Sequence, residues 1–462
     1  MTRNLKTAGT ATTEKLDLEA SQTLLAQADC RLLGDDHIPS ARYTSKLFLD
    51  LEEKSLWPHT WQIACRLEEI PDRGDYYEYE VNTESILVVR QEDGSIKAFA
   101  NACRHRSTRL AQGCGSLGQG GIRCRYHGWS WAINGENTFV LDQGEFSDEG
   151  MKPEDLALIE VPSGVRWGFV FVCPDTPSTD LESFLAPLEP MFEPFGVDIM
   201  RYDWYKSTVL PCNWKVSLDA FVENYHVPAT HPQLILDHNA YEYLQLENGH
   251  AHNHTHKGRE GTFDSKLVER DALNEREQLY RAVSDLADQV NAIYTDREKF
   301  VAAGLRKRPL PEDLSAGVDF VNALHEYAEG AGIPLPKVSS SDTKYLGVTT
   351  IFPNVVVLTS NGNLLGYRAR PNGDDPNSCL FDVFSLRMFP VGEEPIVERE
   401  ELEWTDSRWK LVLSQDFSNM PHVTAGLRSR HSRGYKLNRQ QEMAIMNTHR
   451  EIDNYIARAH EQ

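Results

Sequence analysis

Residues 101–110, NACRHRSTRL, and residues 124–136, CRYHGWSWAINGE, carry the clearest structural signal in the sequence. Each stretch combines one thiol with one imidazole within a few positions, and the four side chains are Cys103, His105, Cys124 and His127. Two short loops of this kind can close on one metal centre. Mixed sulfur and nitrogen ligation suits a structural zinc ion, or an iron–sulfur cluster in which two histidines replace two cysteines on one iron.

The flanking residues favour the cluster, with zinc as the alternative. Zinc loops usually carry Cys-x-x-Cys pairs, whereas each pair here mixes Cys with His. The two stretches resemble the Rieske [2Fe–2S] signature, Cys-x-His followed by Cys-x-x-His-Gly-Trp. The resemblance implies that Cys103, His105, Cys124 and His127 hold a Rieske cluster. Cys114 lies between the loops without a partner cysteine in the second loop, which resembles the oxygenase type rather than the disulfide-bearing respiratory type.

The sequence around these loops follows a strand pattern. A hairpin is expected at Asp93-Gly94, because glycine adopts positive φ at little cost. The expected strands are residues 85–90, 95–100 and 166–172. Together they predict a small all-β domain, and the turn-rich stretch Pro174–Asp180 is the expected linker behind it.

A second group of chemistry-bearing residues lies in the stretch NWKVSLDAFVENYHVPATH, which ends at His231. A helix continuing up to Pro228 would place Asp219, Glu223 and His226 on one face, at positions i, i+4 and i+7. Pro228 would then turn the chain and bring His231 back beside His226. An ordinary helix with two unrelated histidines is the alternative.

Beside the cluster loops, this stretch resembles the mononuclear iron motif of Rieske non-haem iron oxygenases. The resemblance implies that His226 and His231 bind mononuclear Fe(II) together with a distant aspartate. Such a two-histidine, one-carboxylate face leaves positions free for dioxygen. Asp416, in LVLSQDFSNMPHVTAGLRSR, is the best match for the aspartate, with Asp406 and Glu403 as the alternatives.

Two further acids have expected roles in catalysis. The resemblance implies that Glu223 connects the iron site to the Rieske centre of a neighbouring subunit, by hydrogen bonds to His226 and to His127 of that subunit. Many family members have aspartate at this position, so glutamate lengthens the reach. Asp219 is a candidate for orienting a ligand histidine, or an ordinary helix acid.

The resemblance implies an α+β fold, with a small all-β Rieske [2Fe–2S] domain followed by a catalytic domain whose curved antiparallel sheet is flanked by helices. The expected divisions are residues 1–60 for an N-terminal arm and helices packing on the catalytic domain, 61–175 for the Rieske domain, and 176–462 for the catalytic mononuclear iron domain. Helices are expected at residues 14–28, 45–56, 265–303, 311–330 and 439–459, and catalytic-domain strands at 345–359, 364–370 and 379–390.

Charge and composition narrow the partners. The 462 residues include 47 Lys and Arg against 69 Asp and Glu, a formal net charge of −22. So acidic a surface repels phosphate backbones and anionic lipids, which argues against nucleic-acid and membrane partners. The first twenty residues lack the apolar core of a signal peptide, and no window approaches a membrane span. A cytoplasmic protein is therefore expected.

The resemblance also implies a reaction. Electrons originating from NAD(P)H would pass through a reductase or ferredoxin to the cluster and then to iron, where dioxygen is activated to hydroxylate a small organic substrate, preferably aromatic. The electron donor is expected to be a separate polypeptide, because no Gly-rich dinucleotide motif follows a strand. The alternatives are oxidative O- or N-demethylation, and a Rieske electron carrier with a non-catalytic second domain. A homotrimer, or a trimer with a small beta subunit, would set each cluster against a neighbour's iron.

Two features have no role in this scheme. His250, His252, His254 and His256 alternate, so on a strand they would share one face. A third metal site is one hypothesis, and a pocket wall or a wet surface is the preferred one, since no carboxylate or cysteine joins them at ligand spacing. The charged stretch 265–330 predicts either a lid over the active site or a solvated packing element.

Overall fold

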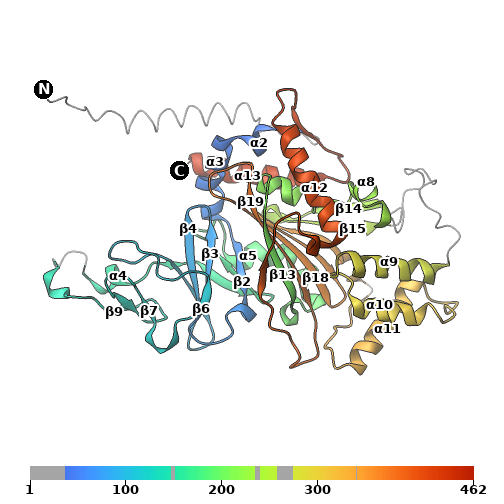
Figure 1. The fold of residues 1–462 in the computed structure, drawn as a ribbon, viewed down its shortest axis with the longest axis horizontal. Coiled ribbons are helices and arrows are strands. Elements are labelled where there is room, and N and C mark those ends of the chain that lie inside the picture. Colours follow the sequence, from blue (N-terminus) through green and yellow to red (C-terminus); the bar gives the residue numbers. More distant parts are fainter. Residues whose placement is uncertain (1–36, 147–150, 235–239, 257–273, 340, 462) are drawn as a thin grey trace.

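The computed structural model describes residues 37–461 except 147–150, 235–239, 257–273 and 340. It has two parts side by side, one made of small sheets and one of a large sheet with helices packed against it (Figure 1). This arrangement confirms the expected α+β fold class. The helix expected at residues 14–28 lies outside the described residues.

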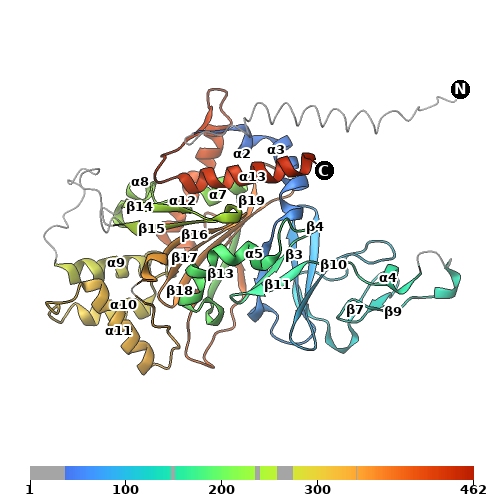
Figure 2. The ribbon, with the colours of Figure 1, turned by 180° about the vertical axis from the view of Figure 1, so that it is seen from behind.

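The all-β part contains three small sheets. A five-stranded sheet has the order β10–β5–β4–β3–β6, and two three-stranded sheets have the orders β7–β8–β9 and β11–β12–β2. The strands are β2 (Gln62–Arg66), β3 (Asp75–Val81), β4 (Glu84–Arg90), β5 (Ile96–Ala100), β6 (Cys114–Ser116), β7 (Ile122–Arg123), β8 (Ser130–Trp131), β9 (Asn137–Phe139), β10 (Glu160–Val161), β11 (Ser163–Arg166) and β12 (Phe169–Val172). The β7–β8–β9 sheet lies at the tip of the molecule farthest from the large sheet (Figures 1 and 2).

Two tight turns in the all-β part were expected differently from the sequence: one was predicted as a hairpin, and the other lies within a predicted single strand. The hairpin expected at Asp93-Gly94 is confirmed: it joins β4 to β5, and the Asp93 carboxylate accepts the Ser95 backbone N–H at 2.9 Å. The single strand expected at residues 166–172 is wrong. Trp167 and Gly168 both have positive φ, 50° and 76°, so they form the two-residue turn of a hairpin between β11 and β12.

The second part is built on one eight-stranded sheet of order β14–β15–β16–β17–β18–β19–β13–β20, antiparallel except between β13 and β20. All nine residues of the central strand β18 are buried, because elements pack on both of its faces. The strands are β13 (Arg201–Leu210), β14 (Ala240–Gln245), β15 (Ala251–His256), β16 (Gly347–Ile351), β17 (Val355–Ser360), β18 (Asn363–Pro371), β19 (Cys379–Arg387) and β20 (Arg399–Glu401). The strand expected at 345–359 is therefore a hairpin, β16 and β17, which reverses around Pro353, a residue without an N–H for the ladder.

Helices from both ends of the chain and one from its middle lie together on the large sheet (Figures 1 and 2). They are α2 (Ala41–Thr44), α3 (Lys46–Ser55), α7 (Trp214–Asp219), α12 (Lys410–Leu427) and α13 (Met443–Glu461). The helix expected at 45–56 is confirmed, with Ser45 as its N-cap. The helix expected from 439 begins at Met443, because Asn438 caps a preceding turn instead. No helix in the described part of the chain has the length and apolar composition needed to cross a bilayer.

A separate group of three helices packs beside the sheet: α9 (Glu275–Gln289), α10 (Asp296–Leu305) and α11 (Ala316–Gly330). The single helix expected over 265–303 is wrong in its described part. The chain breaks at Asn291, where φ is 61°, and restarts at Thr295, whose side chain and Glu298 form a capping box. The three helices share an apolar core that includes Val283, Leu305 and Phe320.

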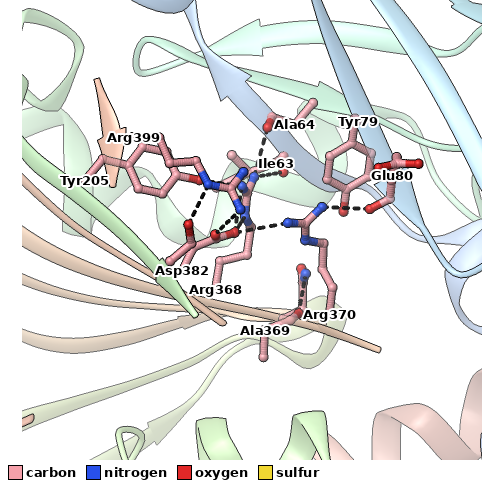
Figure 3. Close-up of polar contacts among 12 residues, drawn as sticks. Ile63, Ala64, Tyr79, Glu80, Tyr205, Arg368, Ala369, Arg370, Asp382 and Arg399 are labelled. Atoms are coloured by element: carbon pink, nitrogen blue, oxygen red, sulfur yellow. Dashed lines mark hydrogen bonds and ion pairs between the residues drawn. The ribbon is translucent and has the colours of Figure 1, made fainter. Parts of the chain in front are cut away.

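A buried carboxylate with three arginines joins the two parts of the molecule (Figure 3). Asp382 on β19 lies 2.9 Å from Arg368, 3.3 Å from Arg370 and 3.1 Å from Arg399, measured from carboxylate oxygen to guanidinium nitrogen. Arg368 and Arg370 are on β18, and Arg399 is on β20. We call these four residues the Asp382 clamp.

Two arginines of the clamp reach across to the all-β part (Figure 3). Arg368 donates to the backbone carbonyls of Ile63 and Ala64 in β2, each at 2.8 Å. Arg370 donates to the Glu80 carbonyl in β3 at 2.7 Å. Because one carboxylate holds both arginines, it fixes the position of β2 and β3 on the large sheet.

Candidate metal centres

The stretch that carries the two expected iron-binding histidines is not one helix. Helix α7 ends at Asp219, and a four-residue helix α8 (Val227–Thr230) follows, so the continuous helix expected up to Pro228 is wrong. The Glu223 carboxylate accepts backbone N–H groups of Tyr225 and His226, a local alternative to helical hydrogen bonds. Pro228 occupies the first turn of α8, where its missing N–H costs nothing.

Three of the predicted ligands nevertheless meet at one point. His226 and His231 flank α8, and Asp416 projects from α12. One Asp416 oxygen, Oδ1, lies 2.8 Å from His231 Nε2 and 3.6 Å from His226 Nε2. The three potential ligand atoms all lie within 4.8 Å of one another. Asp416 and His231 are buried, and the His226 side chain is 24% exposed.

The hydrogen bonds behind the two rings decide which nitrogens can bind a metal. His226 Nδ1 lies 2.6 Å from Glu223 Oε1, and His231 Nδ1 lies 2.8 Å from Gln415 Oε1. Both partners are acceptors, so each Nδ1 carries the proton. Both Nε2 lone pairs then point toward the Asp416 carboxylate, an arrangement that a bound cation would stabilise. The donor set fits the two-histidine, one-carboxylate arrangement of non-haem iron sites.

Charge around His226 agrees with this arrangement. Burial alone would lower the pKa of His226, but the Glu223 and Asp416 carboxylates raise it above its ordinary value. These carboxylates therefore favour positive charge on or beside this ring, whether from a proton or a metal ion.

Asp219 lies elsewhere. Its Oδ2 accepts the Tyr43 hydroxyl at 2.8 Å, and that hydroxyl lies 2.9 Å from His449 Nε2. Burial raises the pKa of Asp219 to about 8. The Nδ1 partners of the two site histidines are Glu223 and Gln415, not Asp219. Sequence reasoning missed Gln415, although it directly precedes the predicted ligand Asp416 on α12.

The alternatives to Asp416 are not part of the site. Asp406 caps a short helix, Ser407–Trp409, and its Oδ2 pairs with Arg408 at 2.8 Å. The Glu403 carbonyl accepts the Trp409 indole N–H at 2.9 Å. The three-residue ligand group found among the described residues contains Asp416 rather than either of them.

The alternating histidines are structural where their side chains are described. His250 is fully buried, with Nε2 2.9 Å from the Phe184 carbonyl and Nδ1 accepting the Phe352 backbone N–H at 3.1 Å. Burial lowers its pKa to about 4, so it is a neutral core residue rather than a pocket wall or wet surface. His252 is also buried and lies 3.0 Å from the Thr349 hydroxyl.

The predicted cluster ligands lie in two matching loops. The Ser107 N–H donates to the Cys103 carbonyl at 2.9 Å, and the Gly128 N–H donates to the Cys124 carbonyl at 3.0 Å. The first loop follows β5, and the second connects β7 to β8 in the tip sheet β7–β8–β9.

The four side chains fit a Rieske cluster. The Cys103 and Cys124 thiols are free and buried, and the His105 and His127 rings lie 4.6 Å apart. His105 Nδ1 is buried without a hydrogen-bond partner among the described residues, which is costly unless that nitrogen binds a metal. Trp129 stacks on the His105 ring at 5.0 Å. Two thiols and two imidazoles are the ligands of a Rieske [2Fe–2S] centre.

Comparison with known proteins agrees with both centres. Residues 60–142 match the Rieske [2Fe–2S] domain, and residues 197–458 match the catalytic domain of the ring-hydroxylating alpha subunit. The chain belongs to the ring-hydroxylating alpha subunit family. Both groups of predicted ligands fall inside the matched ranges.

Curated relatives of this chain include two kinds of oxygenase. It is 31% identical over 207 residues to the glycine betaine monooxygenase oxygenase subunit of Chromohalobacter salexigens, covering 44% of each chain. It is 33% identical over 186 residues to the large oxygenase component of the naphthalene 1,2-dioxygenase system of Ralstonia sp., covering 39% of this chain and 41% of the relative. The aligned region therefore spans less than half of these relatives.

Solved structures share the fold over most of this chain. The quaternary ammonium Rieske monooxygenase CntA in complex with L-carnitine superposes with a TM-score of 0.61 at 17% identity, over 92% of this chain and 97% of that chain. Naphthalene 1,2-dioxygenase from Rhodococcus sp. bound to indole gives a TM-score of 0.59 at 17% identity, over 96% and 98%.

Proposed function

We propose that this chain is the oxygenase component of a Rieske non-haem iron oxygenase. It would take electrons from a separate reductase or ferredoxin, which draws them from NAD(P)H, and use dioxygen to hydroxylate a small organic substrate. The observation that carries the proposal is the convergence of His226, His231 and Asp416, with both imidazole lone pairs directed at one carboxylate oxygen. The His105 and His127 rings 4.6 Å apart and the free, buried Cys103 and Cys124 thiols support a cluster site in the all-β part.

The chain's own residues have distinct tasks in this scheme. When bound, the cluster supplies single electrons, and the iron supplies the position at which dioxygen is reduced. His226, His231 and Asp416 would hold the iron. Glu223 keeps the proton on His226 Nδ1, so that Nε2 stays available to the metal. Cys103, His105, Cys124 and His127 would hold the cluster.

Two reactions fit this machinery. Hydroxylation of an aromatic substrate, as part of aromatic hydrocarbon catabolism, is the first, and oxidative O- or N-demethylation is the second. The match to a glycine betaine monooxygenase subunit supports the second, and the match to a naphthalene dioxygenase component supports the first.

The test of the function uses the purified chain, a reductase and ¹⁸O₂. The protein should be brown and, when reduced, give the rhombic resonance signal of a cluster with two histidine ligands. Aromatic dihydroxylation places two labelled oxygens in the product, whereas demethylation uses one oxygen atom on the substrate. A colourless, zinc-loaded protein made under iron-replete conditions would contradict the proposal.

The separation of the two centres supports an assembly of several subunits. The tip sheet next to the cluster loops lies at one end of the molecule, and α8 and α12 lie toward the other (Figures 1 and 2). We expect a head-to-tail trimer, either of this chain alone or with a small beta subunit, located in the cytoplasm. Glu223, which holds His226 Nδ1, is the expected contact to His127 of the neighbouring subunit.

Replacing Glu223 with Gln should reduce turnover by about 10–100-fold without removing either metal centre. Gln can still accept from His226 Nδ1, but it lacks the charge that supports electron transfer between subunits. Single-turnover transfer from the reduced cluster to iron measures the effect, and Glu329→Gln, an exposed change on α11, is the control. An unchanged transfer rate would rule out the bridging role, and a fully active monomer would rule out the trimer.

A further inference from the structure

We infer that Gln415 is a positioning residue for His231, and that it is held in place by a chain of side-chain amides that reaches helix α9. The inference rests on the proposed function, because it treats His231 as an iron ligand. The amide chain consists of Gln415 on α12, Gln233 in the turn after His231, and Gln289 at the end of α9.

Gln233 donates hydrogen bonds to both of the other glutamines. Gln415 Oε1 lies 2.8 Å from His231 Nδ1 and also accepts Gln233 Nε2 at 2.8 Å. Gln233 Nε2 also donates to Gln289 Oε1 at 3.1 Å. One amide oxygen therefore receives two N–H groups, and the second amide is itself oriented by a third.

This arrangement solves a problem that a lone glutamine would leave open. A glutamine side chain can turn over and present its NH₂ group to the ring, and the proton would then move from His231 Nδ1 to Nε2. If Gln415 turned over, its NH₂ group would face the NH₂ group of Gln233. Both groups are hydrogen-bond donors, so this contact would be lost. Gln233 could turn over to match it only if Gln289 turned over as well, because Gln233 Nε2 also donates to Gln289 Oε1. The amide chain therefore keeps the proton on Nδ1 and the lone pair on Nε2, facing Asp416.

The two iron ligands consequently have unequal support. A carboxylate, Glu223, lies behind His226, and a neutral amide, Gln415, lies behind His231. A carboxylate partner makes an imidazole a stronger donor than an amide does. His226 should therefore bind the metal more strongly of the two. The orientation of His231 depends instead on neutral hydrogen bonds.

The amide chain also gives the α9–α11 layer a role. These helices have their own apolar core, so Gln289 is attached to a rigid element. The stretch that the sequence left as either a lid or a packing element thereby contributes a fixed support for the second iron ligand.

The test compares Gln415→Met, which keeps the shape but removes the acceptor, with Gln415→Glu, which restores an acceptor. The labile iron is removed from the full chain with a chelator, the Rieske cluster is retained, and Fe(II) is titrated back in competition with the chelator. We expect Gln415→Met to weaken Fe(II) binding by about 10–100-fold and to change the resonance signal of the nitric oxide adduct. Gln415→Glu should bind Fe(II) within a few-fold of the wild type.

Further variants separate positioning from folding. Gln233→Met leaves Gln415 in place but frees it to turn over, so it should weaken Fe(II) binding less than Gln415→Met. Gln440→Met, an exposed glutamine outside the site, is the matched control and should bind Fe(II) as the wild type does. An unchanged Rieske spectrum shows that each variant is folded.

Two results would overturn the inference. Wild-type Fe(II) affinity in Gln415→Met would show that the amide does not position His231. Equal losses in Gln415→Met and Gln415→Glu would show that restoring an acceptor does not restore the site, which contradicts the role assigned to the amide oxygen. The proposed function fails separately, and the inference with it, if the wild-type chain takes up no Fe(II) or if Asp416→Ala takes it up as tightly.

Discussion

The Asp416→Ala variant should contain a normal Rieske cluster and almost no catalytic iron. Asp416 supplies the only anionic oxygen in the three-residue group found among the described residues, and it faces both His226 Nε2 and His231 Nε2. Without it, two neutral imidazoles remain to hold a divalent ion. Turnover should fall by more than the roughly 10–100-fold that loss of an outer hydrogen-bond partner costs.

Iron content and the reduced Rieske resonance signal, measured on the same sample, check this expectation. The cluster should be unaffected because its four predicted ligands lie in the other part of the molecule. Asp406→Ala is the matched control, since this carboxylate pairs with Arg408 outside the site. Normal turnover in Asp416→Ala together with loss in Asp406→Ala would reverse the assignment.

Replacing Asp382 with Asn should lower the free energy of unfolding by about 3–5 kcal/mol, because it removes the negative partner from buried arginines. Asn keeps the size of the side chain but cannot balance Arg368, Arg370 and Arg399. Two of these arginines also hold backbone carbonyls of β2 and β3. The Rieske part should therefore loosen on the large sheet first.

The pH dependence of this variant has a defined sign. Burial alone would raise the pKa of Asp382, but Arg368, Arg399 and Arg370 hold it well below its usual range. Its stabilisation is therefore fully present above the unfolded pKa of about 3.9 and is lost as the pH falls through the lower folded value. The difference in free energy of unfolding between the wild type and Asp382→Asn should therefore become smaller as the pH falls below about 3.9.

Urea unfolding at several pH values measures both the loss of unfolding free energy and its dependence on pH. Glu160→Gln is the control, because Glu160 forms an exposed pair with Lys97 at 3.0 Å, and such pairs contribute about 1 kcal/mol or less. A loss in Asp382→Asn no larger than that of the control would show that the clamp does not stabilise the joint.

The sequence predicted those features whose residues lie close together in the chain. The two cluster loops and the His226–His231 pair are short motifs, and the hairpin at Asp93-Gly94 needs only its own two residues. Asp416 lies far from the two histidines in the sequence; it was predicted by resemblance to a family motif rather than from local spacing, and the structure brings it to them.

The remaining features depend on contacts between distant segments, which residue patterns do not encode. Gln415 meets His231 across 184 positions, and Arg368 meets Ile63 across 305. The expected long helix before Pro228 failed for a related reason. Helical spacing was compatible with it, but the Glu223 carboxylate offers backbone N–H groups a competing partner that spacing alone does not reveal.

The short helix α8 makes the number of residues between His226 and His231 critical. His226 and His231 stand at its two ends, so one helical turn is the spacer that sets how far apart the two imidazoles are and how they are rotated. One inserted or deleted residue would swing His231 by about 100° around the helix axis, away from both Asp416 and Gln415. Substitution at exposed Ala229 should be tolerated, whereas a change in the number of residues should not. In any redesign of this protein, residues of the turn between the histidines can be substituted, but their number cannot be changed.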